Sequence, residues 1–321
     1  TEYLGIKYPS WLDGTNTGGS AFIFHINHAY EAILSGKCET VIILYGSMQK
    51  SQQEITFGLR PAIYSNQFDV MAGLPLPVGA YAMAANRHMF KYGTTKEDLA
   101  EIAVATRAWA SLNPNATYKK KLTVDEVLSS KIISTPLNKL DCCLVTDGGG
   151  AVVMTSEKRA KELKKQPIYI LGYGESSSHA SINYMPDMAY LEVAEHSSKK
   201  AYKMSNKNPS DIDLAMIYDS FTITVLMTLE ALGICKVGEG KDFIKNQRTA
   251  PGGDFALNTN GGGLSYCHPG MYSIFTIIEA CRQLWGICGK RQVKNIKNAL
   301  CHGTGGVLSS AATVILSKDS E

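Results

Sequence analysis

The feature that most constrains the fold is an alternation of helical and strand-like runs, with glycine-rich turns at the strand ends. The run from Ala21 to about Leu34 has apolar residues at helical spacing, and residues 40–46, TVIILYG, form a short β-branched run that ends in glycine. A helix followed by a buried strand predicts an α/β layer. Because the pattern returns after residue 142 and continues toward the C-terminus, we predict an α/β protein with a duplicated architecture.

The second part of the chain supplies the remaining elements of this prediction. Its strand-like runs are CCLVTDGGGAVVMTS (strand, glycine turn, strand), PIYILGYG, DLAMIYDSF, ALCHGTGG and AATVILSK. Its helical runs are SEKRAKELKK, TITVLMTLEALG and FTIIEACRQLWG.

Residues 50 to about 135 differ from the rest, because their first part contains several prolines and glycines and little periodicity. Two helical patterns follow, around AYAMAANRHMFKYG and TKEDLAEIAVATRAWAS. Thr95 with Asp98 resembles a capping box, with Asp in place of Glu. We interpret this segment as a cap inserted into the α/β core.

Composition excludes several classes of function. The 321 residues are 45% hydrophobic and 19% charged with a net charge of +3, which gives no reason to expect nucleic acid or an anionic membrane as partner. No apolar stretch approaches the length of a membrane span, and there is no signal peptide. The eight cysteines lack zinc-ligand spacing, so we predict no metal site and reduced thiols in a cytoplasmic protein. The basic run at 119–121 predicts a solvated face, or a contact with a phosphate-bearing ligand.

The turn at residues 13–20, DGTNTGGS, enters the first helix. The start of a helix favours negative charge and lowers the pKa of a cysteine placed there, so such turns often carry a nucleophile. This turn, which we call the opening turn, offers Thr15, Asn16, Thr17 and Ser20, and contains no cysteine.

Three further stretches carry candidate functional residues. NTNGGGLSYCHPG, residues 258–270, sets His268 beside three consecutive glycines that allow close approach to a ligand. In IYDSF, residues 217–221, polar side chains follow a strand, at the edge where open α/β sheets bind ligands. Alternatively, Asp219 is the N-cap of the next helix. In LCHGTGG, residues 300–306, Cys301 and His302 are neighbours in a strand, so we expect only one of them to face a given pocket.

Together these stretches resemble the thiolase superfamily, and within it the sterol-carrier-protein-type thiolases with their lipid-transfer and steroid side-chain aldolase relatives. The motifs that carry the resemblance are DGTNTGGSAF, RHMFKYGTT, NPNATY, STPLNKLDCC, VTDGGGAVV, IYDSFTITVLMTLEALGICKVGEG, LNTNGGGLSYCHPG, RQV and CHGTGG. The resemblance implies two similar βαβαβαββ halves in a five-layered α/β/α/β/α fold, divided at 1–156 and 157–321, with a loop domain at about 50–135. It also implies that the N-terminal part of the first half is absent, and that the protein is at least a homodimer.

The departures from the family pattern bear on function. Matching Gly19 to the glycine of the family's Cys-x-Ser-Gly motif puts Asn16 at the position of the nucleophilic cysteine. Tyr218 replaces the histidine of the His-Asp-x-Phe motif, while His268 of the Gly-His-Pro motif is kept. The Cys-x-Gly motif is met by Cys301, His302 and Gly303. This combination resembles the aldolases of the family, which work without a covalent acyl-enzyme.

The resemblance therefore implies an enzyme, a carbon–carbon lyase that cleaves a β-hydroxyacyl-CoA by a retro-aldol reaction. Coenzyme A enters as part of the acyl-CoA substrate, with no separate cofactor. Tyr218 is expected to transfer a proton, His268 to bind the thioester oxygen, and Cys301 or His302 to protonate carbon. The residues expected to contact substrate are Asn16, Asp219, Ser220, Asn258, Gly262 and Gly303. The alternatives are a non-catalytic acyl-CoA- or lipid-binding or scaffold subunit, and residual acetyl-CoA acyltransferase (thiolase) activity that uses Cys301. Relatives of this branch imply a separate zinc-ribbon/OB-fold partner protein.

Overall fold

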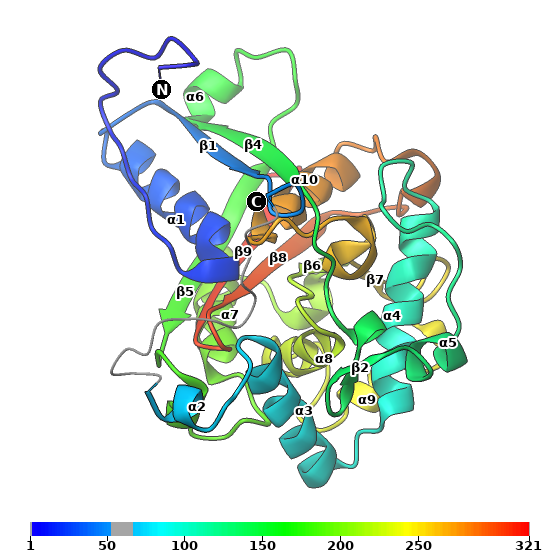
Figure 1. The fold of residues 1–321 in the computed structure, drawn as a ribbon. Helices are drawn as coiled ribbons and strands as arrows, with labels where there is room; N and C mark the ends of the chain where they lie inside the picture. The colour runs from blue at the N-terminus through cyan, green and yellow to red at the C-terminus, as the bar shows by residue number, and fades with distance from the viewer. Residues whose placement is uncertain (1, 53–66, 321) are drawn as a thin grey trace.

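The computed structural model describes residues 2–52 and 67–320, and its main feature is a five-stranded sheet in the order β5-β9-β8-β6-β7 (Figure 1). The strands are β5 (Tyr169–Ser177), β6 (Leu214–Ile217), β7 (Ala256–Leu257), β8 (Asn298–Gly305) and β9 (Ser310–Ser317). β6 runs parallel to β7 and β8, while β9 is antiparallel to both β8 and β5. The parallel register pairs Ile217 with His302, so the polar residues after β6 lie beside the glycine-rich end of β8.

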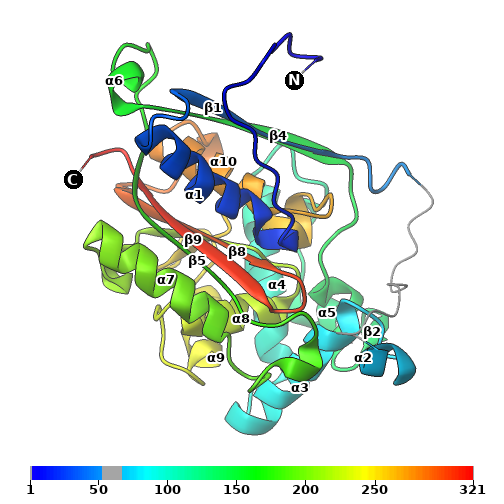
Figure 2. The ribbon, with the colours of Figure 1, turned by 90° about the vertical axis from the view of Figure 1, so that its left-hand side faces the viewer.

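Helices cover both faces of this sheet. One face carries α7 (Glu192–Ser205) and α8 (Thr222–Ala231), and the other carries α1 (Ala21–Leu34) and α10 (Ser273–Leu284) (Figure 2). Strands β6, β8 and β9 are buried along almost their whole length, which agrees with the apolar sequence LAMI of β6 and the mainly apolar or small residues of β8 and β9.

A second sheet lies beyond α1 and α10. It pairs β1 (Thr40–Ser47) with β4 (Gly148–Thr155), antiparallel at all eight positions. The described residues thus form four of the five layers that the resemblance implies: helices, sheet, helices, sheet (Figure 2). On the outer face of β1–β4, Ile42, Leu44 and Val153 are exposed, and no helix in the described ranges packs across them.

The predicted cap segment is mostly helical in its described part. It contains α2 (Gln67–Met71), α3 (Val78–Tyr92), α4 (Lys96–Ser111), α5 (Val124–Leu128) and β2 (Ile132–Ser134), and is followed by β3 (Leu137–Asn138). The capping box of Thr95 and Asp98 is confirmed, since both reciprocal hydrogen bonds are present. Part of the proline- and glycine-rich stretch, residues 53–66, lies outside the described residues.

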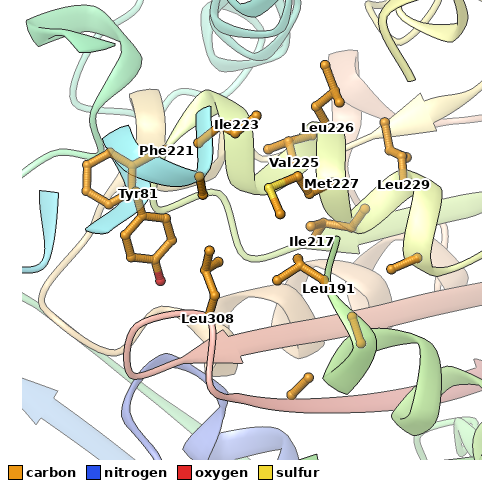
Figure 3. Packing of buried hydrophobic residues seen from close by; sticks show 14 of the residues in the cluster. Tyr81, Leu191, Ile217, Phe221, Ile223, Val225, Leu226, Met227, Leu229 and Leu308 are labelled. Atoms are coloured by element: carbon orange, nitrogen blue, oxygen red, sulfur yellow. The ribbon is translucent and has the colours of Figure 1, made fainter. Parts of the chain in front are cut away.

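The core on the α7–α8 face fixes where the chain leaves β6. Every residue of α8 is buried, because α3, α4 and α7 surround it. Phe221, directly before α8, packs its ring 4.5 Å from that of Tyr81 on α3, and Leu308 lies below them (Figure 3). The segment from Tyr218 to Phe221 is therefore held between the sheet and the cap.

Two sequence predictions were wrong in extent. Within residues 142–156 there is a single strand, β4, because the predicted turn glycines Gly148 to Gly150 pair directly with β1 and so belong to the strand, while residues 143–147 are irregular. The helix predicted over SEKRAKELKK is only α6 (Glu157–Ala160), which has no buried residue and so lacks packing to extend it.

A short helix, α9 (Gly240–Phe243), follows α8. Among the described residues, no helix combines the length and apolar character needed to cross a membrane.

Candidate functional site

The centre of the site is a hydrogen-bonded pair, Tyr218 and His268. Tyr218 follows the last residue of β6, and its backbone N–H bonds to the carbonyl of His302, which prolongs the pairing with β8. Its hydroxyl oxygen lies 2.7 Å from Nε2 of His268 and donates to the carbonyl of Gly270 at 3.0 Å. The two residues are only 4% and 9% exposed. The structure thus brings together two of the four residues predicted to be catalytic.

The opening turn closes over this pair. A Cβ at Gly19 would lie 2.7 Å from Cζ of Tyr218, and one at Gly18 would lie 2.8 Å from the backbone nitrogen of Gly306. The turn therefore packs its own glycines against the tyrosine ring and against the glycine-rich end of β8. Glycine is needed at position 19 because this approach leaves no room for a side chain.

Asn16 lies apart from the pair. Its side chain is exposed, and its Oδ1 accepts the N–H of Gly18 at 3.0 Å within the opening turn itself. This local hydrogen bond accounts for an asparagine at position 16 as a turn residue, without any contact to a ligand. Substrate binding by Asn16 stays a prediction.

Burial sets the protonation states of the pair in opposite directions. It raises the pKa of Tyr218 well above the ordinary value, helped by the nearby Cys143 thiol. It lowers the pKa of His268 to about 4, against the opposing effect of the backbone carbonyls of His268 and Leu144. At neutral pH the site therefore holds a neutral phenol beside a neutral imidazole. Such a pair can exchange a proton or donate a hydrogen bond without a fixed charge.

Asp219 supports the loop that carries His268. Its fully buried carboxylate accepts the N–H groups of Gly263 at 2.6 Å and Leu264 at 3.1 Å. Burial raises its pKa to about 7, although these two N–H groups act in the other direction. The alternative that Asp219 caps the next helix is wrong, because Phe221 is the N-cap of α8 and no side chain caps it. Gly262 has φ +60°, and a Cβ there would collide with Asp219.

Asn258 joins the same loop to the sheet. Its Oδ1 accepts the N–H of Ile217 at 2.7 Å, and its own φ is +50°. Its Nδ2 is buried without a hydrogen-bond partner in the part of the chain that the structure describes. Ser220 bonds to Thr224 on α8. A Cβ at Gly303 would lie 2.9 Å from Cα of Ser20, so this position packs against the opening turn.

Cys301 and His302 point to opposite faces of the sheet, as their adjacent positions predicted. Sγ of Cys301 lies 3.5 Å from the carbonyl of Thr276 on α10, and burial raises the pKa of its thiol well above the usual value. Nδ1 of His302 bonds to Thr313 at 2.8 Å, and burial lowers its pKa to about 3. Neither side chain has a hydrogen bond to Tyr218 or His268. Carbon protonation by either residue stays a prediction that these contacts do not support.

Sequence reasoning missed the strap of residues 143–146. Cys143 donates its N–H to Ser220, and Thr146 both donates to the carbonyl of His268 at 3.2 Å and accepts its N–H at 2.9 Å. The strap therefore holds the backbone of His268, while Tyr218 contacts its imidazole. A threonine in the otherwise apolar run CCLVT was the available signal.

Tyr272 was missed as well. Its ring stacks on His268 at 6.5 Å and meets Tyr218 edge-on at 5.7 Å. In the described ranges, no group of three or more His, Cys, Asp or Glu residues could hold a metal ion, and all eight cysteines are free.

Comparison with known proteins agrees with this geometry. A sequence model of the family described as Thiolase C-terminal domain-like matches residues 174–318. The steroid side-chain-cleaving aldolase of Thermomonospora curvata is 34% identical over 327 residues, which cover 95% of this chain and 81% of that protein. The solved structure of an Ltp2-ChsH2(DUF35) aldolase is 32% identical, with a TM-score of 0.86 over 95% of this chain and 79% of that chain.

The four-layered α/β architecture and its likeness to these relatives thus define a protein of the thiolase fold. The acetyl-CoA acetyltransferase of Methanothermobacter thermautotrophicus is 34% identical over 253 residues, which cover 78% of this chain. The chain belongs to the thiolase superfamily, with sterol-carrier and steroid-aldolase proteins among its relatives. It spans 66% of the length of the acetyltransferase.

Proposed function

We propose that this protein is a carbon–carbon lyase that cleaves a β-hydroxyacyl-CoA by a retro-aldol reaction. The observation that carries the proposal is the buried Tyr218–His268 pair, with a 2.7 Å hydrogen bond, beneath an opening turn that contains no cysteine. Without a cysteine at this turn, formation of an acyl-enzyme there lacks the thiol nucleophile of a thiolase. The pair still offers proton transfer and hydrogen bonding to a developing oxyanion.

In the proposed reaction, the β-hydroxyl group loses its proton while the bond between the α and β carbons breaks. The β carbon becomes a carbonyl, and the electron pair passes to the thioester as an enolate. Protonation of the α carbon then gives a shortened acyl-CoA and a released ketone or aldehyde. No external oxidant, reductant or free coenzyme A is consumed.

The protonation states limit what the pair does. A phenol whose pKa is raised is a poor base alone, so Tyr218 takes the substrate proton only while passing its own to Nε2 of His268. For this transfer the hydroxyl hydrogen turns from the carbonyl of Gly270 toward Nε2. The reverse transfer returns the proton for the α carbon. In this scheme the pair acts as one acid–base unit, and neither residue needs a charge in the resting state.

A second candidate is a non-catalytic acyl-CoA-binding or scaffold subunit. The small exposure of Tyr218 and His268 favours it, because a substrate has little direct access to them. A thiolase reaction through Cys301 is less well supported, since its thiol contacts α10 and burial raises its pKa.

We further propose that the protein works as an assembly. A solved relative, the Ltp2-ChsH2(DUF35) aldolase, carries the names of two components, which supports a partner subunit. That this partner is a separate zinc-ribbon/OB-fold protein, and that this chain forms a homodimer, are proposals that rest on the family resemblance.

The test is to incubate the purified protein with a panel of β-hydroxyacyl-CoA esters and no free coenzyme A, and to follow the products by mass spectrometry. A shortened acyl-CoA with a released carbonyl compound is expected. Tyr218→Phe should lower the rate by roughly 10²–10⁴-fold, the usual range for loss of a proton-transfer group. Product formation only when free coenzyme A and a β-ketoacyl-CoA are supplied would instead establish thiolysis. Binding of the esters without turnover would favour the second candidate.

A further inference from the structure

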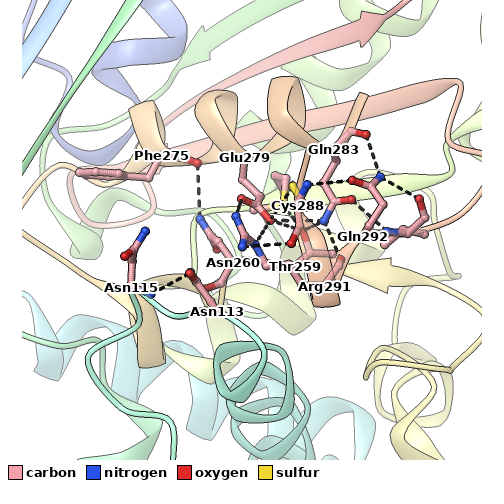
Figure 4. Close-up of polar contacts among 12 residues, drawn as sticks. Asn113, Asn115, Thr259, Asn260, Phe275, Glu279, Gln283, Cys288, Arg291 and Gln292 are labelled. Carbon is pink, nitrogen blue, oxygen red and sulfur yellow. Dashed lines mark hydrogen bonds and ion pairs between the residues drawn. The ribbon is translucent and has the colours of Figure 1, made fainter. Parts of the chain in front are cut away.

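Behind the 258–270 loop lies a buried ionic network that the proposed chemistry does not use (Figure 4). Its centre is Glu279 on α10, 2% exposed, paired with Arg291. Nε of Arg291 lies 2.8 Å from Oε1 and Nη2 lies 3.0 Å from Oε2, so the guanidinium engages both carboxylate oxygens. Such two-pronged pairs fix geometry as well as charge.

The network reaches the loop through one hydroxyl group. Oγ1 of Thr259 donates to Oε1 of Glu279 at 3.0 Å and accepts Nε2 of Gln283 at 3.0 Å. Gln283 in turn donates to the carbonyl of Arg291 at 2.9 Å. Thr259 is therefore held by two side chains of α10, which are themselves held by Arg291.

The residues on either side of Thr259 connect this anchor to the site. Asn258 binds the backbone of β6 directly before Tyr218. Oδ1 of Asn260 accepts the hydroxyl of Tyr272 at 2.8 Å, and the ring of Tyr272 packs against both His268 and Tyr218. A shift of Thr259 thus moves both sides of the hydrogen-bonded pair.

We propose that Glu279 is a positioning residue, which sets the Tyr218–His268 hydrogen bond through Thr259 and the flanking asparagines. The inference deepens the proposed function and rests on it for its kinetic readout. A buried ion pair is weak support for stability alone, because well-packed apolar groups often stabilise as much. The hydrogen bond from Thr259 to Glu279 lets the carboxylate hold the 258–270 loop in position, which an apolar group of equal volume could not do.

The acceptor count explains why a carboxylate is required. Oε1 receives the hydroxyl of Thr259, one nitrogen each of Gln283 and Arg291, and the thiol of Cys288, while Oε2 receives the second nitrogen of Arg291. Glutamine has one acceptor oxygen, so Glu279→Gln turns an amide donor toward either Arg291 or Thr259. The clamp on Thr259 then loosens although the side-chain volume is unchanged.

The experiment compares four variants of the protein. Glu279→Gln and Thr259→Val break the connection, while Thr259→Ser keeps the hydroxyl group. The matched control is Glu230→Gln. Glu230 is a second buried glutamate, which lies on α8 and pairs with His88. Folding is checked by thermal unfolding, and the imidazole resonance of His268 is read by NMR after assignment with His268→Gln.

We expect Glu279→Gln and Thr259→Val to shift the His268 resonance, and Thr259→Ser and Glu230→Gln to leave it in place. With a CoA ester that the wild type cleaves, kcat should fall about 10–100-fold in Glu279→Gln and Thr259→Val, while KM stays within about twofold. A loss of this size is expected when a reacting group is misplaced by about 1 Å. An unmoved His268 resonance in folded Glu279→Gln and Thr259→Val would overturn the inference. If the wild type cleaves no ester but the His268 resonance still shifts in Glu279→Gln and Thr259→Val, the proposed reaction is wrong and the positioning role of Glu279 stands.

Discussion

At the residue scale, Gly19 decides whether the opening turn can rest on Tyr218. A Cβ there lies 2.7 Å from the tyrosine ring, whereas one at Gly14 meets no atom within 4 Å. Gly19→Ala should therefore lower the free energy of unfolding by about 1–3 kcal/mol, the usual cost of overpacking. Gly14→Ala, the control from the same turn, should stay within about 0.5 kcal/mol. Urea unfolding of both variants tests this, and equal stabilities would contradict the packing described.

Asp219 gives a second prediction at this scale. Asp219→Asn replaces one acceptor oxygen by an amide that faces the N–H groups of Gly263 or Leu264. Leaving such a buried group unsatisfied should cost about 1–3 kcal/mol. The measurement is again urea unfolding, with Asp254→Asn as the control, since that carboxyl group is exposed.

The pKa of Asp219 adds a pH dependence to that cost. Burial raises the pKa from 3.8 to about 7, so between these values the folded state holds a proton that the unfolded state has lost. The contribution of this carboxyl group to stability is therefore full below pH 4 and falls as pH rises toward 7, with a slope of at most about 1.4 kcal/mol per pH unit. Asp219→Asn lacks this titration, so it should be more destabilising, relative to the wild type, at pH 5 than at pH 7.5. A difference that grows with pH would show that the pKa is lowered instead.

At the element scale, the start of α4 depends on a local signal. The hydroxyl of Thr95 accepts the N–H of Asp98, whose carboxylate accepts the N–H of Thr95. Thr95→Ala should lower the free energy of unfolding by about 1 kcal/mol, while Thr95→Ser should retain most of it. Thermal unfolding measures both variants. Equal stabilities of Thr95→Ala and Thr95→Ser would show that the Thr95 hydroxyl does not stabilise the start of α4.

The elements show what sequence could predict and what it could not. Long periodic runs such as α1, and the buried strands β6 and β9, could be predicted because their apolar composition indicates burial. β8 could be predicted from its glycine-rich end rather than from its composition, since it contains Asn298, His302 and Thr304. The extent of α6 could not, since it depends on packing that the helix lacks. The same limit applies to the site: the motifs predicted Tyr218 and His268, but Thr146 and Glu279 act through contacts across 122 and 20 residues of chain, which no local pattern encodes.

At the scale of the whole molecule, the two predicted halves share one core. Phe22 and Ile23 of α1 pack in the same cluster as Met216 of β6 and Ile274 of α10, and the opening turn lies against the end of β8. Since α1 and α10 are buried between the two sheets, removing either half would expose the apolar faces of the other. Tyr218 and His268 lie in the second predicted half, and the opening turn of the first packs against Tyr218, so the packing of the pair depends on both predicted halves.

This shared core predicts that the halves unfold together. Trp109 on α4 and Trp285 at the end of α10 report from different regions, Trp109 buried beside Thr249 and Trp285 bonded to Gln166. In urea, tryptophan fluorescence and far-ultraviolet circular dichroism should therefore follow one coincident transition, the mark of a single cooperative unit. Glu279→Gln should shift that midpoint without splitting it, because the network lies inside the common core. Two separated transitions would mean that the halves fold independently, and that Tyr218 and His268 keep their positions without the opening turn above them.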